Sequence, residues 1–171
     1  MSRLFIAVWP PESVIEQMSD IEQPKDKGVR WLPMETRHIT LHFLGEADPD
    51  DVVGALERCR LPSAVARLGP AFDSFAEHCL VIPAGGLDEL AAIVKRAVEP
   101  LGTFRSRRRF VGHLTIAKLG RGARPDRSIG RRFDAQFDVE EIALVESTLL
   151  AGGAEYETLA TWPTMDQPRP D

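Results

Sequence analysis

Two related octapeptides decide the fold of this chain: His38-Ile39-Thr40-Leu41-His42-Phe43-Leu44-Gly45 (residues 38–45) and His113-Leu114-Thr115-Ile116-Ala117-Lys118-Leu119-Gly120 (residues 113–120). They share His, Thr, Leu and Gly at the same offsets, and both are apolar at the second and fourth places. Each copy also follows a predicted helix and a connection. We interpret the repeat as a duplicated lobe with a pseudo-two-fold axis, which would bring the two motifs face to face across a cleft.

Both octapeptides have the composition of a β-strand, in which successive side chains point to opposite faces. One face of the first copy then carries His38, Thr40 and His42, and the same face of the second copy carries His113 and Thr115. The other face of each strand is apolar and suits the core of its own lobe. The polar faces are therefore predicted to line the cleft.

Two imidazoles and two hydroxyls around one small site suit chemistry at phosphorus. In-line displacement needs the attacking and leaving oxygens on opposite sides of the phosphorus. Because histidine titrates near neutrality, one imidazole can supply a general acid and the other a general base. Threonine hydroxyls can donate hydrogen bonds to the non-bridging oxygens, where charge builds up. This scheme requires no metal and no cofactor.

The rest of the chain alternates irregularly between predicted strands and helices. Strands are expected over 3–9, 37–45, 71–75, 79–82, 113–120, 137–150 and 156–162, and helices over 11–23, after Asp48-Pro49, and between Gly86 and Gly102. The two last strands would form a closing hairpin around Gly152-Gly153. This order favours an α+β fold with two mainly antiparallel sheets, helices packed outside and the active site in the central cleft. Residues 163–171 are expected to fray.

Length and composition limit the class of protein. The 171 residues suit a single domain over 1–171, and an apolar share of 43% predicts a packed core. No apolar run approaches the about 20 residues that span a bilayer, and the opening MSRLFIAVWPP is too short for a secretory signal. Cys59 and Cys79 indicate reduced thiols in a cytoplasmic protein. We expect a monomer, since no heptad pattern is present.

The charge is unevenly distributed. The net charge is -5, which argues against a globally basic nucleic-acid-binding surface. Ten basic residues and one acid nevertheless fall between Arg105 and Arg132, and Arg dominates this segment. Guanidinium groups make forked contacts with phosphate oxygens. The segment therefore predicts a local anion site, although a solvated arginine-rich loop would have the same composition.

The chain resembles the two-histidine phosphoesterase superfamily, and more narrowly the LigT-like RNA 2',3'-cyclic phosphodiesterases. The resemblance covers nearly the whole chain: the opening RLFIAVWPP, the stretch 30–33 (RWLP), both H-x-T motifs, and the closing segments 144–147 (LVES) and 152–156 (GGAEY). It implies a bilobal fold with a central active site. The implied reaction is hydrolysis of RNA 2',3'-cyclic phosphate ends to 2'-phosphomonoesters.

The resemblance also implies roles for the motif residues. His38 would donate a proton to the leaving 3' oxygen, and His113 would accept a proton from water. Thr40 and Thr115 would hold the phosphate. The residues around the motifs that could contact the substrate are His42, Trp31, Phe110, Lys118 and Arg121.

Three positions depart from the family pattern. Gly112 stands where Pro often precedes the second His, Lys118 stands where Arg is common, and His42 replaces a smaller residue. Lys keeps the positive charge but lacks the forked geometry of Arg. These differences bear on substrate preference rather than on the core chemistry.

Three alternatives remain open at this point. A phosphodiesterase of small cyclic nucleotides would use the same residues, and a non-catalytic RNA-end binder would use the same cleft. The third alternative is a metal site, since His38, His42 and His113 together would offer three imidazole ligands.

Overall fold

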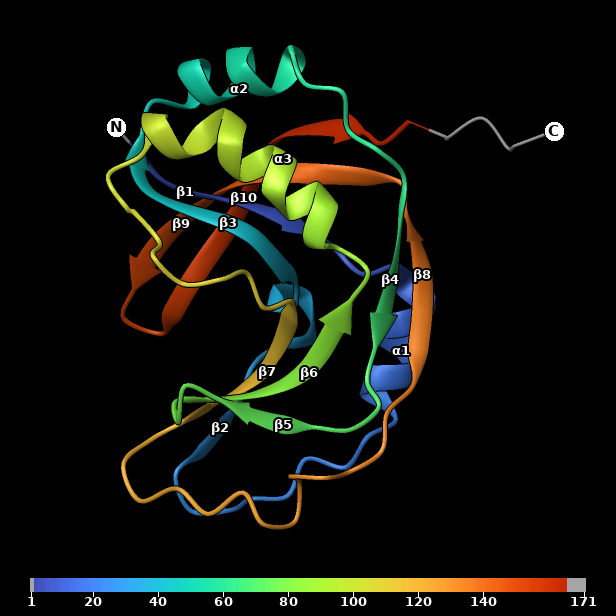
Figure 1. Cartoon of the computed structure of the whole chain (residues 1–171). Coiled ribbons are helices and arrows are strands. Elements are labelled where there is room, and N and C mark those ends of the chain that lie inside the picture. The colour runs from blue at the N-terminus through green and yellow to red at the C-terminus, as the bar shows by residue number, and fades with distance from the viewer. Residues whose placement is uncertain (1, 166–171) are drawn as a thin grey trace, which may run out of the picture.

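Ten strands form one strongly curled antiparallel sheet in the computed structural model, which describes residues 2–165 (Figure 1). Their order is β10-β9-β1-β3-β7-β6-β4-β8, with β2 paired to β7 and β5 paired to β6. The strands are β1 (Ser2–Val8), β2 (Val29–Trp31), β3 (Ile39–Ala47), β4 (Ala64–Leu68), β5 (Asp73–Phe75), β6 (Cys79–Gly85), β7 (His113–Leu119), β8 (Ala135–Val139), β9 (Glu141–Leu150) and β10 (Gly153–Pro163).

Three α-helices of the described residues pack on the outside of this sheet. They are α1 (Glu12–Ser19), α2 (Pro49–Glu57) and α3 (Asp88–Val98), and single 3-10 turns lie at η1 (Met34–Thr36) and η2 (Glu99–Leu101). The Asp48 side chain caps α2 by accepting from the Asp50 amide at 2.9 Å, as the Asp-Pro signal predicts. Helices α2 and α3 lie side by side over the β1–β3 half of the sheet, whereas α1 is seen behind β4 and β8 in Figure 1.

The α+β class with antiparallel pairing agrees with the sequence, but the expectation of two separate sheets is wrong. The two motif strands, β3 and β7, pair directly and join the halves into one sheet. This pairing consists of a single residue pair, Ile39 with Leu114. Each half contributes one octapeptide, and the seam between the halves is therefore the narrowest connection in the sheet.

Both motif strands contain a β-bulge at the same place in the octapeptide. In the register of β3 against β1, Thr40 pairs with Ala7 and His42 pairs with Ile6, so Leu41 has no partner. In the register of β7 against β6, Thr115 and Ala117 are paired, and Ile116 is skipped. A bulge places two consecutive residues opposite one and reverses the alternation beyond it. The side chains after each bulge therefore face opposite to the simple strand pattern.

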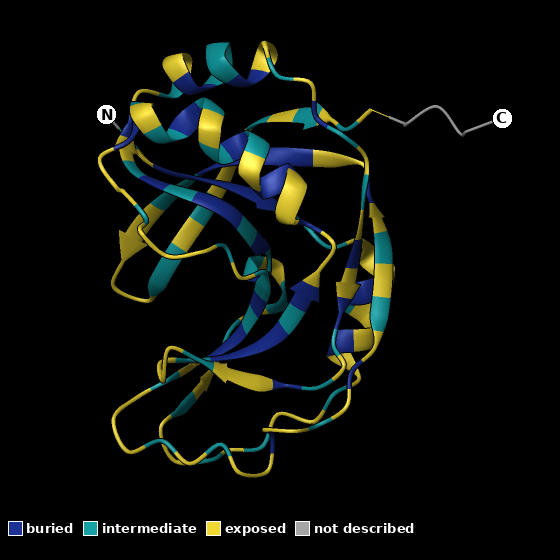
Figure 2. Ribbon diagram, viewed as in Figure 1, coloured by how far each residue is buried: buried dark blue, intermediate teal, exposed yellow. Residues whose placement is uncertain are grey.

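The core fills the space between the sheet and the helices. Buried residues concentrate in the central strands β1, β3 and β6 (Figure 2). A smaller apolar cluster lies on the other face of β1, and it contains Phe5, Ala7, Ala143 and Val145. Because both faces of β1 are covered, its sequence reads as a continuous apolar run. No helix within residues 2–165 is long and apolar enough to cross a membrane.

Close packing explains the glycine before the second motif. A Cβ atom at Gly112 would lie 2.1 Å from the Ala84 carbonyl oxygen, and the Gly112 carbonyl accepts from the Ala84 amide at 2.9 Å. A residue with a Cβ atom, such as proline, would not fit here without displacement of β6. Gly112 thus fixes how His113 enters β7.

Three other expectations need correction. Phe137 belongs to β8, not to the closing hairpin, which β9 and β10 form. Strands β2 and β4 have no counterpart in the predicted elements. The expectation that the chain frays from residue 163 is wrong for residues 164 and 165. The Met165 amide donates to the Leu61 carbonyl, and the Thr164 hydroxyl donates to the Val139 carbonyl. Residues 166–171 lie outside the described part of the chain.

Candidate active site

A cavity of about 710 Å³ is lined by the His and Thr residues of both motifs: His38, Thr40, His113 and Thr115. It lies against β3 and β7, and the tip of the β9–β10 hairpin forms a wall through Leu149 and Leu150, among other residues. A volume of this size accommodates a nucleotide-sized ligand. Two segments far apart in the sequence thus contribute imidazoles and hydroxyls to one site.

The single residue pair between β3 and β7 explains why the two motifs meet in one cavity. Ile39 and Leu114 pair in antiparallel register and point into the core. Extension of this register places His38 beside Thr115, and Thr40 beside His113. Each motif therefore meets the other with its order reversed, which is the arrangement that a local two-fold axis through the seam produces.

The His38 ring is fixed by backbone and aromatic contacts. Its Nδ1 lies 2.7 Å from the Thr36 carbonyl oxygen, and its Nε2 lies 3.1 Å from the Thr40 hydroxyl. Phe5 stacks on the ring at a centroid distance of 4.8 Å, while Trp9 and Tyr156 pack edge-on. Burial lowers the pKa of His38, and positive charge on His113 and Lys118 lowers it further, whereas the Thr36 carbonyl opposes the shift.

The His113 ring is held in the same way. Its Nδ1 lies 2.7 Å from the Val111 carbonyl oxygen, two residues earlier, and Phe75 stacks on the ring at 4.2 Å. A carbonyl oxygen only accepts hydrogen bonds, so in both histidines Nδ1 carries a proton when this bond forms. The acid-base atom left for a ligand is therefore Nε2 in both rings.

The cavity is electropositive. Arg3, Arg30 and Lys118 line it, and no carboxylate is among its lining residues within 2–165. Arg30 pairs with Lys118 across β2 and β7, so both side chains share a face, and the Lys118 ammonium donates to the Cys79 thiol at 3.7 Å. Such a charge distribution favours an anionic ligand. Lys118 reaches the cavity because the bulge at Ile116 turns it inward.

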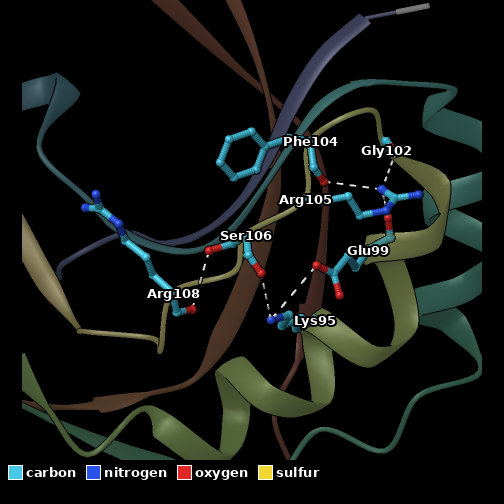
Figure 3. A network of polar contacts seen from close by, with 7 residues as sticks. All are labelled: Lys95, Glu99, Gly102, Phe104, Arg105, Ser106 and Arg108. Carbon is cyan, nitrogen blue, oxygen red and sulfur yellow. Dashed lines mark hydrogen bonds and ion pairs between the residues drawn. The ribbon is translucent and has the colours of Figure 1, made fainter.

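The basic segment 105–132 does not form the single anion site that its composition predicts. Of its ten cations, only Lys118 lines the cavity. The Arg105 guanidinium instead donates to the carbonyls of Glu99, Gly102 and Phe104 at the end of α3 and η2 (Figure 3). On the other side of β7, Arg127 pairs with Asp26 and Arg131 with Glu22. Strand β7 separates these two loops, so contiguity in sequence is not proximity in space.

His42 lies on the opposite face of β3 from the cavity, contrary to the parity prediction. Only 6% of its surface is exposed, and its Nε2 has no hydrogen-bond partner among the described residues. Phe43 lines the cavity instead, because the bulge at Leu41 reverses the alternation. Burial lowers the pKa of His42, with the charges of Glu99 and Lys95 acting in opposite directions. His42 cannot contact the same ligand as His38.

Three other predicted contacts also lie away from the cavity. Trp31 packs against the core, and its indole donates to the Pro24 carbonyl at 3.0 Å. Phe110 packs against the same core cluster, and Arg121 is exposed outside the cavity lining. Trp31 lies away from the cavity because its neighbour on β2, Arg30, is the residue that pairs with Lys118 and shares its face.

Several cavity residues were missed by the sequence interpretation. Strand parity in 3–9 would have placed Arg3 and Phe5 on one face, and a strand over 29–31 would have selected Arg30 over Trp31. Phe75 ends β5, and His78 lies in the turn that follows, which carries no comparable signal. His78 is exposed and also lines the cavity.

The three-histidine metal site does not form, because His42 and His38 occupy opposite faces of β3. Within residues 2–165, no group of three His, Cys, Asp or Glu side chains is arranged to hold a metal ion. The polar groups that line the cavity include the imidazoles of His38 and His113, the hydroxyls of Thr40 and Thr115, and three cationic side chains. Such a set suits the binding of phosphate and the transfer of protons.

Comparison with known proteins identifies the family of the chain. Residues 10–149 match the family model of the 2'-5' RNA ligase superfamily. An RNA 2',3'-cyclic phosphodiesterase of Methanocaldococcus jannaschii is 30% identical over 94% of this chain and 99% of its own length. The enzyme of the same name from Escherichia coli K12 is 28% identical over 94% and 95%.

Solved structures give the same relationship. The crystal structure of E. coli LigT complexed with 3'-AMP superposes with a TM-score of 0.77 at 25% identity, and covers 95% of this chain and 98% of that one. A crystal structure described as a phosphoesterase gives a TM-score of 0.78 at 25% identity over 95% and 98%. The chain therefore belongs to the 2'-5' RNA ligase superfamily, as a LigT-like two-histidine phosphoesterase.

Proposed function

We propose that the protein hydrolyses the 2',3'-cyclic phosphate at RNA ends to a 2'-phosphomonoester by metal-independent acid-base catalysis. The observation that carries this proposal is the matched setting of the two histidines, each with Nδ1 2.7 Å from a carbonyl two residues earlier and each in the same cavity. The relatives named RNA 2',3'-cyclic phosphodiesterase support the substrate class.

The proposed reaction exchanges one bond at phosphorus. Nε2 of His113 accepts a proton from water as the water oxygen attacks phosphorus. The bond from phosphorus to the 3' oxygen breaks, and Nε2 of His38 donates a proton to that oxygen. The hydroxyls of Thr40 and Thr115 donate to the non-bridging oxygens, where charge increases in the transition state. Afterwards His113 carries the extra proton and His38 has lost one, and exchange with solvent restores both.

The role of His38 as proton donor requires that protonation and phosphate binding are coupled. In the free protein, burial lowers the pKa of His38. A phosphate monoanion beside the ring has the opposite effect, because an opposite charge favours the imidazolium. Binding of the substrate would thus supply the charge that keeps the donor protonated.

The test is incubation of the protein with an RNA that ends in a 2',3'-cyclic phosphate, in excess chelator. We expect conversion to a 2'-phosphate, with a bell-shaped pH dependence. A 3'-phosphate product would reverse the leaving-group assignment. Binding without any product would instead favour the RNA-end binder, and turnover confined to nucleoside 2',3'-cyclic phosphates would point to small cyclic nucleotides as the substrate.

Removal of the cavity cation on β7 should change both binding and titration. We expect Lys118→Met to raise KM about tenfold, because one charge-assisted contact to phosphate is lost. The same change should raise the pKa of His38, since the charge of Lys118 lowers it in the wild type. NMR titration of the histidine rings measures the shift. Lys118→Arg keeps the charge and serves as the control; an equal KM and an equal His38 pKa in the two variants would contradict this expectation.

A further inference from the structure

Arg37, the residue before the first catalytic histidine, is a buried cation whose side-chain hydrogen bonds within residues 2–165 all go to uncharged groups. Only 2% of its surface is exposed, and no carboxylate within residues 2–165 lies in ion-pair distance of it. Its guanidinium donates to the Leu32 carbonyl through Nε at 3.1 Å and Nη2 at 2.9 Å, and Nη2 also reaches the Gln23 side-chain oxygen at 3.5 Å. Burial lowers its pKa to about 10, so it remains charged at neutral pH.

Leu32, which accepts the hydrogen bonds of Arg37, is itself hydrogen-bonded to the other motif strand. The Leu32 amide donates to the Ile116 carbonyl at 2.9 Å. Ile116 is the bulged residue of β7, three positions after His113, and is skipped in the register with β6. Leu32 thus connects the second motif, through its amide, to the start of the first motif, through its carbonyl and Arg37.

This connection adds to a seam that is otherwise narrow. Strands β3 and β7 share only the pair Ile39–Leu114. The forked bond from Arg37 to Leu32 closes the segment 32–37, which contains η1 and supplies the Thr36 carbonyl that holds Nδ1 of His38. The position of His38 relative to β7 therefore depends on this closure.

We propose that Arg37 is a positioning residue, which clamps Leu32 and so sets the His38 ring relative to His113 across the seam. The proposal rests on the proposed function for its kinetic consequence, but not for its structural one. Lysine could make a single bond to the Leu32 carbonyl, but only a guanidinium can direct two N–H groups at it. Arg37 itself does not line the cavity.

The kinetic test is Arg37→Met and Arg37→Lys on the RNA cyclic phosphate substrate. A misplacement of about 1 Å in a catalytic group can cost about 10²-fold in rate. We expect Arg37→Met to lose about 30- to 100-fold in kcat, with KM within about threefold of wild type, because the phosphate-binding groups are intact. Arg37→Lys should recover part of this loss.

The matched control is Arg105→Met. Arg105 also directs its guanidinium at backbone carbonyls, but at the end of α3 and η2, away from the cavity (Figure 3). Its loss should lower the melting temperature without a change in kcat. If Arg105→Met lowers kcat as much as Arg37→Met does, the effect is general destabilisation and the proposal is overturned.

A second readout does not require activity. The ¹⁵N chemical shift of His38 Nδ1 reports whether that atom keeps its proton and its bond to Thr36; we expect it to change in both Arg37 variants and to stay constant in Arg105→Met. An unchanged shift in Arg37→Lys together with wild-type kcat overturns the proposal, even if Arg37→Met does not fold. If the wild type hydrolyses no cyclic phosphate, the proposed function fails, and the chemical shift alone decides the role of Arg37.

Discussion

Replacement of His113 by alanine is expected to lower kcat on an RNA 2',3'-cyclic phosphate about 10³-fold, because a positioned acid or base contributes about 10² to 10⁴ in rate. His38→Ala should cost a similar factor. If the two imidazoles act in one concerted step, the double variant should lose little more than either single variant, since residues that act as a unit are not additive. Single-turnover rates of the three variants measure this directly.

The control for the His38 variant is His42, a histidine on the strand β3 that follows it. His42→Phe changes a histidine that lies four residues after His38 but faces the core. Its kcat should stay within about threefold of wild type, which is the range of a mild structural effect. A loss in His42→Phe as large as that in His38→Ala would indicate that the assay reports the integrity of β3, not the chemistry of the cavity.

Replacement of Thr115 by valine should give the second largest loss, about 10²-fold in kcat, which is typical for removal of one hydrogen-bond donor to a developing negative charge. Valine keeps the β-branched shape, so the strand should be preserved. Thr40→Val should show a loss of the same order, and the Thr40 hydroxyl has an additional contact with Nε2 of His38 at 3.1 Å.

Serine provides the control for both positions, because it keeps the hydroxyl and loses only the methyl group. Thr115→Ser and Thr40→Ser should retain most of the turnover. If the serine and valine variants are equally impaired in steady-state assays, the threonines act through packing rather than through their hydroxyls, and their proposed role as phosphate donors is wrong.

The motif strands and most helices could be predicted from the sequence, because local pattern determines them. Isoleucine, threonine and phenylalanine in 39–43 favour a strand, and Asp48 before Pro49 marks a helix start that the structure contains. The bulges could not be predicted. Leu41 and Ile116 are ordinary apolar residues, and a bulge is defined only by the register of the neighbouring strand.

The cations of the cavity show a second limit of sequence interpretation. The many basic residues of 105–132 predict one anion site, but their side chains are distributed to loops on both sides of β7. Arg3 and Arg30 are isolated in the sequence, and they meet Lys118 only because β1 and β2 are placed beside the motif strands. Tertiary pairing, not local composition, assembled the electropositive site.

The matching bulges give the two halves of the cavity the same His and Thr groups but different side chains beside them. In each octapeptide the fifth residue after the histidine turns inward; one half presents the phenyl ring of Phe43 there, and the other presents the ammonium of Lys118. We therefore expect a ligand with one apolar end and one anionic end to bind in one preferred orientation. We expect this orientation to influence which histidine lies beside the leaving oxygen, and an exchange of the residues at positions 43 and 118 tests this.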